Sequence, residues 1–94
     1  MQFEWDPRKA AANAKDHDVE FAEAQTVFGD PLETTIPDPG HSEGEHRFLS
    51  MGRSLASRVL VVSYTERDGR VRIISARPAT GRERKAYESI DPTI

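Results

Sequence analysis

The dipeptide Asp68-Gly69 narrows the choice of fold more than any other feature, because it separates two runs of residues that favour β-strands. A type I′ turn needs a positive φ at both central residues, and Asp-Gly meets that need well. The run before it, 58–66, is the most hydrophobic in the chain, and the run after it, 70–77, begins by alternating arginine with aliphatic residues. The sequence therefore predicts an antiparallel hairpin with its first strand near the centre of a sheet.

A two-residue turn also sets the strand register, and the register decides which face of the sheet each side chain occupies. With Arg67 opposite Arg70, one predicted face carries Arg67, Arg70 and Arg72. The same count places Arg77 on the opposite face, together with Glu66. The hairpin is thus expected to divide its arginines between the two faces.

The net charge of −3 conceals opposite charges in the two halves of the chain. Residues 1–46 hold three basic and eleven acidic side chains, whereas residues 47–94 hold ten basic and five acidic ones. A basic surface suits a polyanion or an acidic protein partner. Arginines crowded on adjacent strands also favour a nearby anion such as a phosphate backbone, although exposure to solvent with ion pairs to Glu66 or Asp68 is an equally simple alternative.

The remaining elements are predicted from capping residues and apolar spacing. Asp6 precedes Pro7 as a helix cap, Gly29 suits a left-handed helix end, and Thr80 and Glu83 have the capping-box spacing. The predicted segments are a short edge strand at 3–5, a helix from Pro7 to about Asp16, a helix over 21–28, a short strand at 32–36, a strand at 47–51, and a final helix to about Glu88.

This order predicts an α+β domain in which an antiparallel sheet of about four strands packs with two N-terminal helices and one C-terminal helix. A chain of 94 residues has room for one core, so residues 1–88 are expected to form a single domain, followed by a flexible tail at 89–94. The chain has no cysteine, which favours the cytoplasm. It also has no export signal and no apolar run that could span a bilayer, so no membrane association is expected.

Several kinds of site lack support in the sequence. No phosphate-binding P-loop, dinucleotide glycine pattern or nucleophile elbow is present. His41, Glu43, Glu45 and His46 could in principle hold a metal ion, but they follow no fixed ligand spacing, and an ordinary polar loop is the preferred interpretation. No metal and no cofactor are therefore expected.

Taken together, a set of short motifs resembles the BrnT family, small toxins of bacterial type II toxin–antitoxin systems with a RelE-like fold. Each motif alone is weak, but their order is specific and covers nearly the whole chain. The motifs are Phe3-Glu4-Trp5-Asp6-Pro7 with Lys9 and Asn13, Lys15-Asp16-His17, Phe21 to Phe28, Asp38-Pro39 through Arg47-Phe48, Arg72-Ile73-Ile74-Ser75-Ala76-Arg77, Ala79-Thr80, Arg82-Glu83-Arg84 and Tyr87.

The resemblance implies a ribonuclease that cleaves RNA, inhibits translation and arrests growth until a BrnA-like antitoxin neutralises it. The antitoxin, rather than the toxin, would contact operator DNA. Two positions depart from the family pattern: Asp18 stands where a glycine is frequent, and Pro78 where a lysine is common.

For cleavage without a metal, a group must activate the ribose 2′-OH, an arginine must stabilise the charged transition state, and an acid must protonate the leaving oxygen. Arg77 is a candidate phosphate ligand because it ends a strand next to the start of the last helix. Tyr64 is one further candidate for proton transfer. The predicted catalytic residues are Arg77, Arg67, Glu66 and His46, and the predicted RNA-binding residues are Arg47, Arg70, Arg72, Arg82 and Lys9.

A non-enzymatic alternative stays open at this point. A basic sheet face could equally serve a binding module whose ligand is an acidic protein or operator DNA. The sequence therefore predicts either a metal-independent endoribonuclease or such a module.

Overall fold

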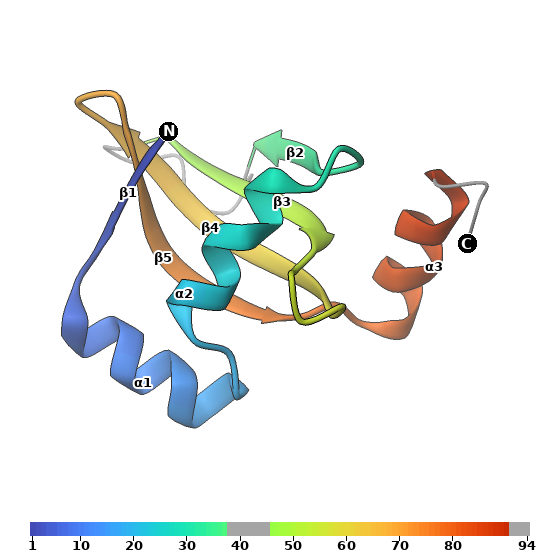
Figure 1. Cartoon of the computed structure of the whole chain (residues 1–94), viewed down its shortest axis with the longest axis horizontal. Helices are drawn as coiled ribbons and strands as arrows, with labels where there is room; N and C mark the ends of the chain where they lie inside the picture. Colours follow the sequence, from blue (N-terminus) through green and yellow to red (C-terminus); the bar gives the residue numbers. More distant parts are fainter. Residues whose placement is uncertain (38–45, 91–94) are drawn as a thin grey trace.

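The computed structural model describes residues 1–37 and 46–90. Figure 1 shows the elements in chain order, with the N-terminus at the start of the first strand. Their bounds are β1 Gln2–Trp5, α1 Pro7–His17, α2 Phe21–Ala24, the 3₁₀ helix η1 Gln25–Gly29, β2 Thr34–Pro37, β3 Arg47–Arg53, β4 Val59–Arg67, β5 Arg70–Pro78 and α3 Gly81–Ile90.

The sheet has five strands in the order β1-β5-β4-β3-β2, so the predicted antiparallel sheet of about four strands is wrong in two details. β1 is a fifth strand, and it pairs with β5 in parallel through the register Phe3↔Val71 and Trp5↔Ile73. The alternation of Phe3 and Trp5 reveals a strand with one buried face, but it carries no information on the neighbouring strand or its direction. The α+β class is confirmed, while the arrangement of the helices differs from the prediction in detail.

The β4–β5 hairpin forms as predicted at its tip and departs from the prediction further along. Asp68 and Gly69 have φ values of 51° and 75°, as a type I′ turn requires. Pairing follows the expected register from Arg67↔Arg70 to Tyr64↔Ile73 and then shifts, so that Ser63 lies opposite Ser75. Ile74 is the extra residue of this β-bulge, which reverses the facing of every later residue of β5.

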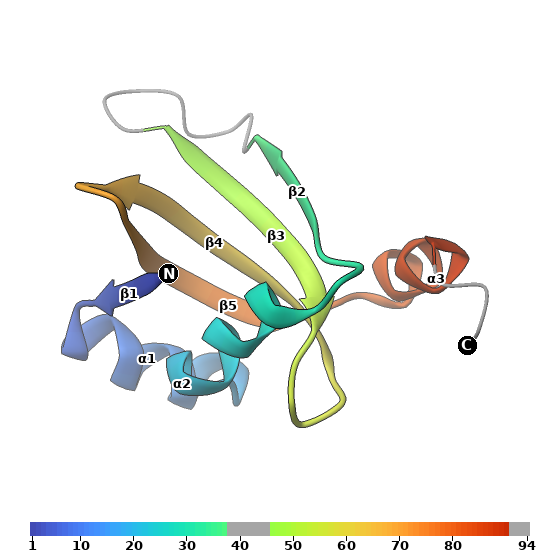
Figure 2. The same ribbon diagram turned by 45° about the horizontal axis from the view of Figure 1, so that its top comes forward.

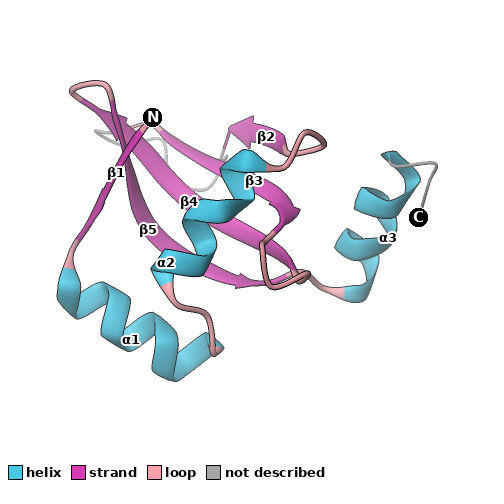
Figure 3. Cartoon of the chain, in the orientation of Figure 1, coloured by secondary structure: helices cyan, strands magenta, loops and turns pink. Residues whose placement is uncertain are grey.

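The two faces of the sheet are covered differently (Figures 2 and 3). α1, α2 and η1 lie together on one face, whereas α3 stands apart from them at the far end of the sheet. The core under α1, α2 and η1 is large and includes Phe21, Leu60 and Ile73. A smaller apolar cluster lies on the other face, where Tyr87 of α3 packs with Val59 and Val61.

The predicted second helix over 21–28 is two shorter pieces, α2 and the 3₁₀ helix η1. Gly29 is the last residue of η1 and has no positive φ, so the predicted left-handed helix end is wrong. The tighter η1 lies close to β3. A Cβ atom on Gly52 of β3 would meet Val27 Cγ1 at 3.0 Å and Asp30 Oδ2 at 3.2 Å, so the packing of η1 requires glycine there.

The first helix begins and ends where the sequence predicts. Asp6 Oδ1 accepts a 2.8 Å hydrogen bond from Arg8 N, and Pro7 occupies the first helical position. At the other end, Asp18 adopts the left-handed conformation with φ 57°. Glycine takes this conformation without strain, so a glycine would also suit this position.

Asn13 of α1 is buried and bonds to the backbone of β5. Its Nδ2 donates to the carbonyl oxygens of Ala76 at 2.8 Å and Val19 at 2.9 Å. Its Oδ1 accepts a 3.0 Å bond from Ala76 N. β1 pairs with β5 only as far as Ile73, so this side chain satisfies the strand edge just beyond the end of β1.

The final helix runs to Ile90, two residues beyond the predicted domain end at 88. Residues 91–94 of the predicted tail lie outside the described residues. No helix in the described part of the chain is long and apolar enough to cross a membrane.

We expect Asn13→Ala to lower the free energy of unfolding by about 2–3 kcal/mol, because it leaves buried polar groups of Ala76 and Val19 without partners. Arg8→Ala, which changes an exposed residue of the same helix, should change it by less than about 0.5 kcal/mol. Urea unfolding of both variants measures the difference. Equal stability of the two variants would show that Asn13 does not hold the edge of β5.

Candidate nucleic-acid interface

The face of the sheet opposite α1 and α2, termed the outer face here, carries most of the predicted RNA-binding arginines. One row of paired residues crosses four strands, in the order Arg47 of β3, Thr65 of β4, Arg72 of β5 and Glu4 of β1. Paired residues on neighbouring strands point to the same face and lie about 5 Å apart. Two arginines therefore flank a buried threonine in the middle of the outer face.

The adjoining rows complete this basic surface. Arg67 pairs directly with Arg70 at the hairpin tip, and both are exposed. At the other end of β5, Arg77 pairs with Val61 and so lies on the outer face, not on the opposite face as predicted. The bulge at Ile74 is the cause of this correction. The outer face thus presents Arg47, Arg67, Arg70, Arg72 and Arg77 together.

The carboxylate that meets the central arginines is Glu4 of β1. Arg72 NH1 donates to Glu4 Oε2 at 2.7 Å, and Arg70 NH1 lies 3.5 Å from Glu4 Oε1. The hydrogen bond from Arg72 is the main reason that the pKa of Glu4 lies below its ordinary value. From the sequence, Glu66 and Asp68 were the expected ion-pair partners of these arginines. Glu4 was not predicted as a partner because β1 was not expected next to β5.

Arg77 is held by Glu83 at the start of α3. Its NH1 and NH2 donate to the two carboxylate oxygens of Glu83 at 2.7 and 3.0 Å. Glu83 also accepts a 2.8 Å bond from Thr80 N, while Thr80 Oγ1 accepts a 3.1 Å bond from Glu83 N. The predicted capping box is therefore confirmed. The anion beside this helix N-terminus is the protein's own carboxylate, where the sequence suggested a phosphate.

These contacts make the Glu83 carboxyl group more acidic than that of an ordinary glutamate. The hydrogen bonds from Arg77 are the largest influence, and together with those from Thr80 they outweigh the effect of burial and lower the pKa of Glu83 to about 2. The same pair raises the pKa of Arg77. Glu83 is therefore ionised at neutral pH and keeps the Arg77 guanidinium in a fixed position on the outer face.

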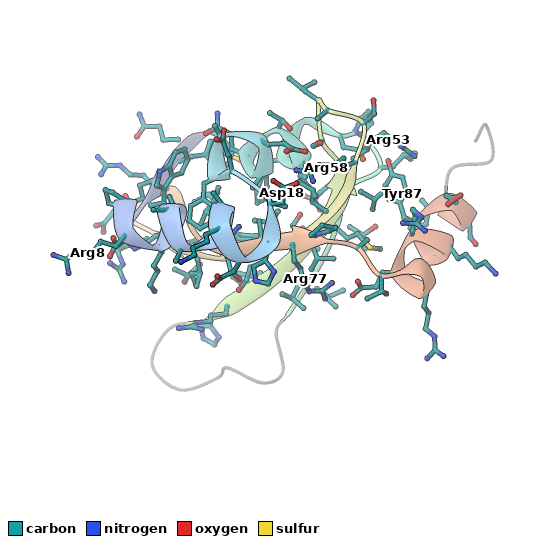
Figure 4. The ribbon with its side chains drawn as sticks, turned by 90° about the horizontal axis from the view of Figure 1, so that it is seen from below. Arg8, Asp18, Arg53, Arg58, Arg77 and Tyr87 are labelled. Atoms are coloured by element: carbon teal, nitrogen blue, oxygen red, sulfur yellow. The ribbon has the colours of Figure 1, made fainter. Side chains whose placement is uncertain are left out.

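α3 is seated on the sheet through Tyr87, whose hydroxyl donates a 2.5 Å bond to Asp30 Oδ2. Asp30 also accepts bonds from Arg53 N at 2.7 Å and Leu32 N at 2.9 Å. Burial alone would raise the pKa of Asp30, but these three bonds outweigh it and leave the pKa below its ordinary value. Arg53 stacks over the Tyr87 ring, 5.5 Å from its centroid, and Figure 4 shows the two side by side.

A second ion-pair cluster joins the β3–β4 turn to the helices, away from the outer face. Arg58 donates to Glu23 at 2.5 and 3.0 Å and to the carbonyl oxygen of Asp18 at 2.9 Å. Figure 4 shows Arg58 close to Asp18, and Arg8 far from both on α1. Arg58 thereby joins the turn before β4 to α2 and to the end of α1.

Three predicted site residues are not placed among the outer-face arginines. Glu66 pairs with the core residue Val71, so its exposed side chain lies on the opposite face. Lys9 is exposed on α1, which packs on that same opposite face. His46 is exposed directly before β3, and its carbonyl oxygen accepts a 2.7 Å bond from Thr65 Oγ1.

Arg82 and Tyr64 complete the predicted set. Arg82 is exposed near the start of α3, next to Glu83. Tyr64 is buried between Phe28 and Phe48, and burial raises the pKa of its hydroxyl. A buried phenol on the helix-covered face is poorly placed to reach a substrate on the outer face.

Among residues 1–37 and 46–90, no group of three or more His, Asp or Glu side chains could hold a metal ion. Three members of the predicted metal alternative, His41, Glu43 and Glu45, lie outside the described residues.

The Arg77–Glu83 pair predicts a defined dependence of stability on pH. Its contribution is complete above the ordinary glutamate pKa of 4.5 and is lost as the pH falls towards about 2. Allowing for solvent exposure, Glu83→Gln should lower the free energy of unfolding by about 1 kcal/mol at pH 7 and by much less at pH 2.5. Glu88→Gln on the same helix is the matched control. If the free energies of unfolding of the wild type and Glu83→Gln differ by the same amount at pH 7 and at pH 2.5, this assignment is wrong.

Comparison with known proteins identifies the fold and the family. The structure is similar to the 1.1 Å crystal structure of the Brucella abortus ribonuclease toxin BrnT, with a TM-score of 0.63 and 19% sequence identity over 85% of this chain and 97% of that one. A comparison with curated protein sequences finds no match. A family model described as the ribonuclease toxin BrnT of a type II toxin–antitoxin system matches residues 5–83. Because this match spans most of the chain, the protein belongs to the BrnT family of ribonuclease toxins.

Proposed function

We propose that this protein is a metal-independent endoribonuclease that binds single-stranded or ribosome-associated RNA on the outer face. The observation that carries the proposal is the gathering of Arg47, Arg67, Arg70, Arg72 and Arg77 on one side of a rigid sheet. Phosphate neutralisation by such side chains supplies most sequence-independent affinity for nucleic acid. Arg82, at the neighbouring end of α3, would extend the same surface.

The arrangement of the arginines suits a stretch of backbone phosphates better than one isolated anion. Arg47 and Arg72 stand on either side of Thr65, two strands apart, and hence about 10 Å from one another at the backbone. Arg72 and Arg77 are oriented by Glu4 and Glu83, which reduces the entropy lost when a substrate binds. Arg77, held by two hydrogen bonds to the Glu83 carboxylate, is the residue that would stabilise the charge of the transition state.

Cleavage would proceed by attack of a ribose 2′-oxygen on the adjacent phosphorus. A bond forms between the 2′-oxygen and phosphorus, the bond to the 5′-oxygen breaks, and the products carry a 2′,3′-cyclic phosphate and a 5′-hydroxyl. One group must accept the proton of the 2′-OH, and one must protonate the departing 5′-oxygen. Each step can be carried out by side chains, so no cofactor enters the proposal.

Of the two residues proposed for proton transfer, His46 is better placed than Glu66. His46 directly precedes Arg47, and its backbone is bonded to Thr65 in the central row of the outer face. Glu66 lies on the other face of β4. Histidine is also the side chain that most often serves as a general acid or base.

In the cell, such cleavage would inhibit translation and arrest growth in the cytoplasm. The family description names a toxin–antitoxin system, so the partner would be an antitoxin encoded with this toxin and similar to BrnA. Contact with operator DNA would then be made by the antitoxin.

The purified protein should cleave single-stranded RNA in the presence of EDTA, leaving cyclic phosphate and 5′-hydroxyl ends. His46→Ala should slow cleavage by about 10²–10⁴-fold, the usual contribution of a proton-transfer group. Gel electrophoresis of end-labelled RNA, followed by analysis of the fragment ends, measures both results.

Glu66→Gln is the matched control and should cleave at close to the wild-type rate. If Glu66→Gln is the slow variant and His46→Ala is not, the assignment of the proton-transfer group is wrong. If the wild type cleaves no RNA, with or without ribosomes, the enzyme proposal itself is wrong.

A further inference from the structure

An apolar groove, termed the α3 slot here, opens on the outer face between α3 and the sheet. Its volume is about 260 Å³, and its lining from the sheet is mainly aliphatic. The residues lining it are Thr34, Ile36, Leu49, Met51, Val61, Arg82, Glu83 and Ala86. Ile36, one of these lining residues, is 51% exposed.

Arginines of β3, β5 and α3 border the α3 slot. On β3, Arg47 and Arg53 flank the slot residues Leu49 and Met51, each two residues away and hence about 7 Å along the strand on the same face. Arg77 pairs with the slot residue Val61. The slot therefore combines an apolar floor with a basic rim.

We infer that the α3 slot is the docking site for an acidic, amphipathic segment of the antitoxin, whose apolar side chains fill the slot while its carboxylates meet the arginines. The inference rests on the proposed function, because it assigns a partner to the same face that binds RNA. Charge complementarity favours this occupant: apolar side chains match the aliphatic floor, and Asp or Glu side chains match the rim.

A nucleobase suits the α3 slot less well. Proteins that bind single-stranded RNA stack bases on aromatic rings or on guanidinium planes and read base edges with polar groups. Apart from Arg82 and Thr34, the slot lining offers neither, and its one carboxylate, Glu83, is already bonded to Arg77 and Thr80. RNA would therefore contact the arginines and leave the slot empty.

Docking in the α3 slot would also explain how the antitoxin blocks RNA binding. A segment seated in the slot would bring its carboxylates to the arginines that hold phosphates in the proposed complex with RNA. Antitoxin and RNA would then exclude one another by competing for Arg47 and Arg77. Neutralisation would need no conformational change of the toxin.

The test compares acidic substitutions in the slot with the same substitutions elsewhere on the surface. Ile36→Asp and Ala86→Asp place a carboxylate in the slot, at residues that are exposed in the free toxin and so should not disturb folding. Leu55→Asp, at an 87% exposed leucine, and Ala12→Asp, at an exposed helical alanine, are the matched controls. Calorimetric titration with the antitoxin of the same operon measures affinity, and RNA cleavage by the free toxin measures activity.

Both slot variants should bind the antitoxin at least about tenfold more weakly, because an unpaired carboxylate in an apolar contact costs more than about 1.4 kcal/mol. Both controls should stay within about twofold of wild type, and all four variants should cleave RNA like the wild type. Unchanged antitoxin affinity in the slot variants would overturn the inference, as would loss of RNA cleavage with retained antitoxin binding, which would assign the slot to RNA. If the wild type cleaves no RNA, the proposed enzyme activity fails, while the affinities still decide the occupant of the slot.

Discussion

The hydrogen bonds between the Asn13 side-chain amide and the backbone of Ala76 fix the position of β5, and the arginines of the outer face depend on that position. β5 contains one extra residue at Ile74, and beyond it the strand has lost its neighbour β1. A free strand edge with a bulge would be prone to slip in register. Asn13 donates to and accepts from Ala76, so it holds the strand in the shifted register and keeps Arg77 on the outer face. A buried amide on α1 thus determines where an arginine lies on the other side of the sheet.

The arginines of the outer face are arranged by carboxylates drawn from other elements. Glu4 of β1 bonds Arg72, and Glu83 of α3 bonds Arg77, so residues from both ends of the chain orient the hairpin. Each such pair at a partly exposed surface contributes at most about 1 kcal/mol to stability. Their larger effect is to hold guanidinium groups in position before a ligand arrives. The arrangement accommodates both proposed ligands, because phosphates and antitoxin carboxylates would use the same donors.

The sequence was most informative where a local rule decides the structure. Asp68-Gly69 predicted the hairpin and its register at the tip, Asp6-Pro7 predicted the start of α1, and Thr80 with Glu83 predicted the capping box. Each of these depends on residues within a few positions of one another. The family also followed from the order of short motifs, and the family model confirms it.

The features that were missed depend on contacts between distant residues. The pairing of β1 with β5, the bulge at Ile74 and the partnership of Glu4 with Arg72 leave no local pattern in the chain. For the same reason Arg77 was predicted on the wrong face. The second helix changes to a 3₁₀ helix where η1 packs closely on Gly52, again a contact remote in sequence. The roles proposed for individual site residues remain predictions.

The central claim is that RNA lies on the outer face, and NMR of the arginine side chains tests it most directly. RNA carrying 2′-O-methyl groups cannot undergo attack by the 2′-oxygen, so it should form a stable complex. The account predicts that titration with this RNA shifts the Nε–Hε signals of Arg47, Arg72 and Arg77, and that these shifts weaken as salt is raised. Arg8 on α1 and Arg58 in its ion pair with Glu23 should not respond. Shifts confined to Arg8 and the α1–α2 face would contradict the account.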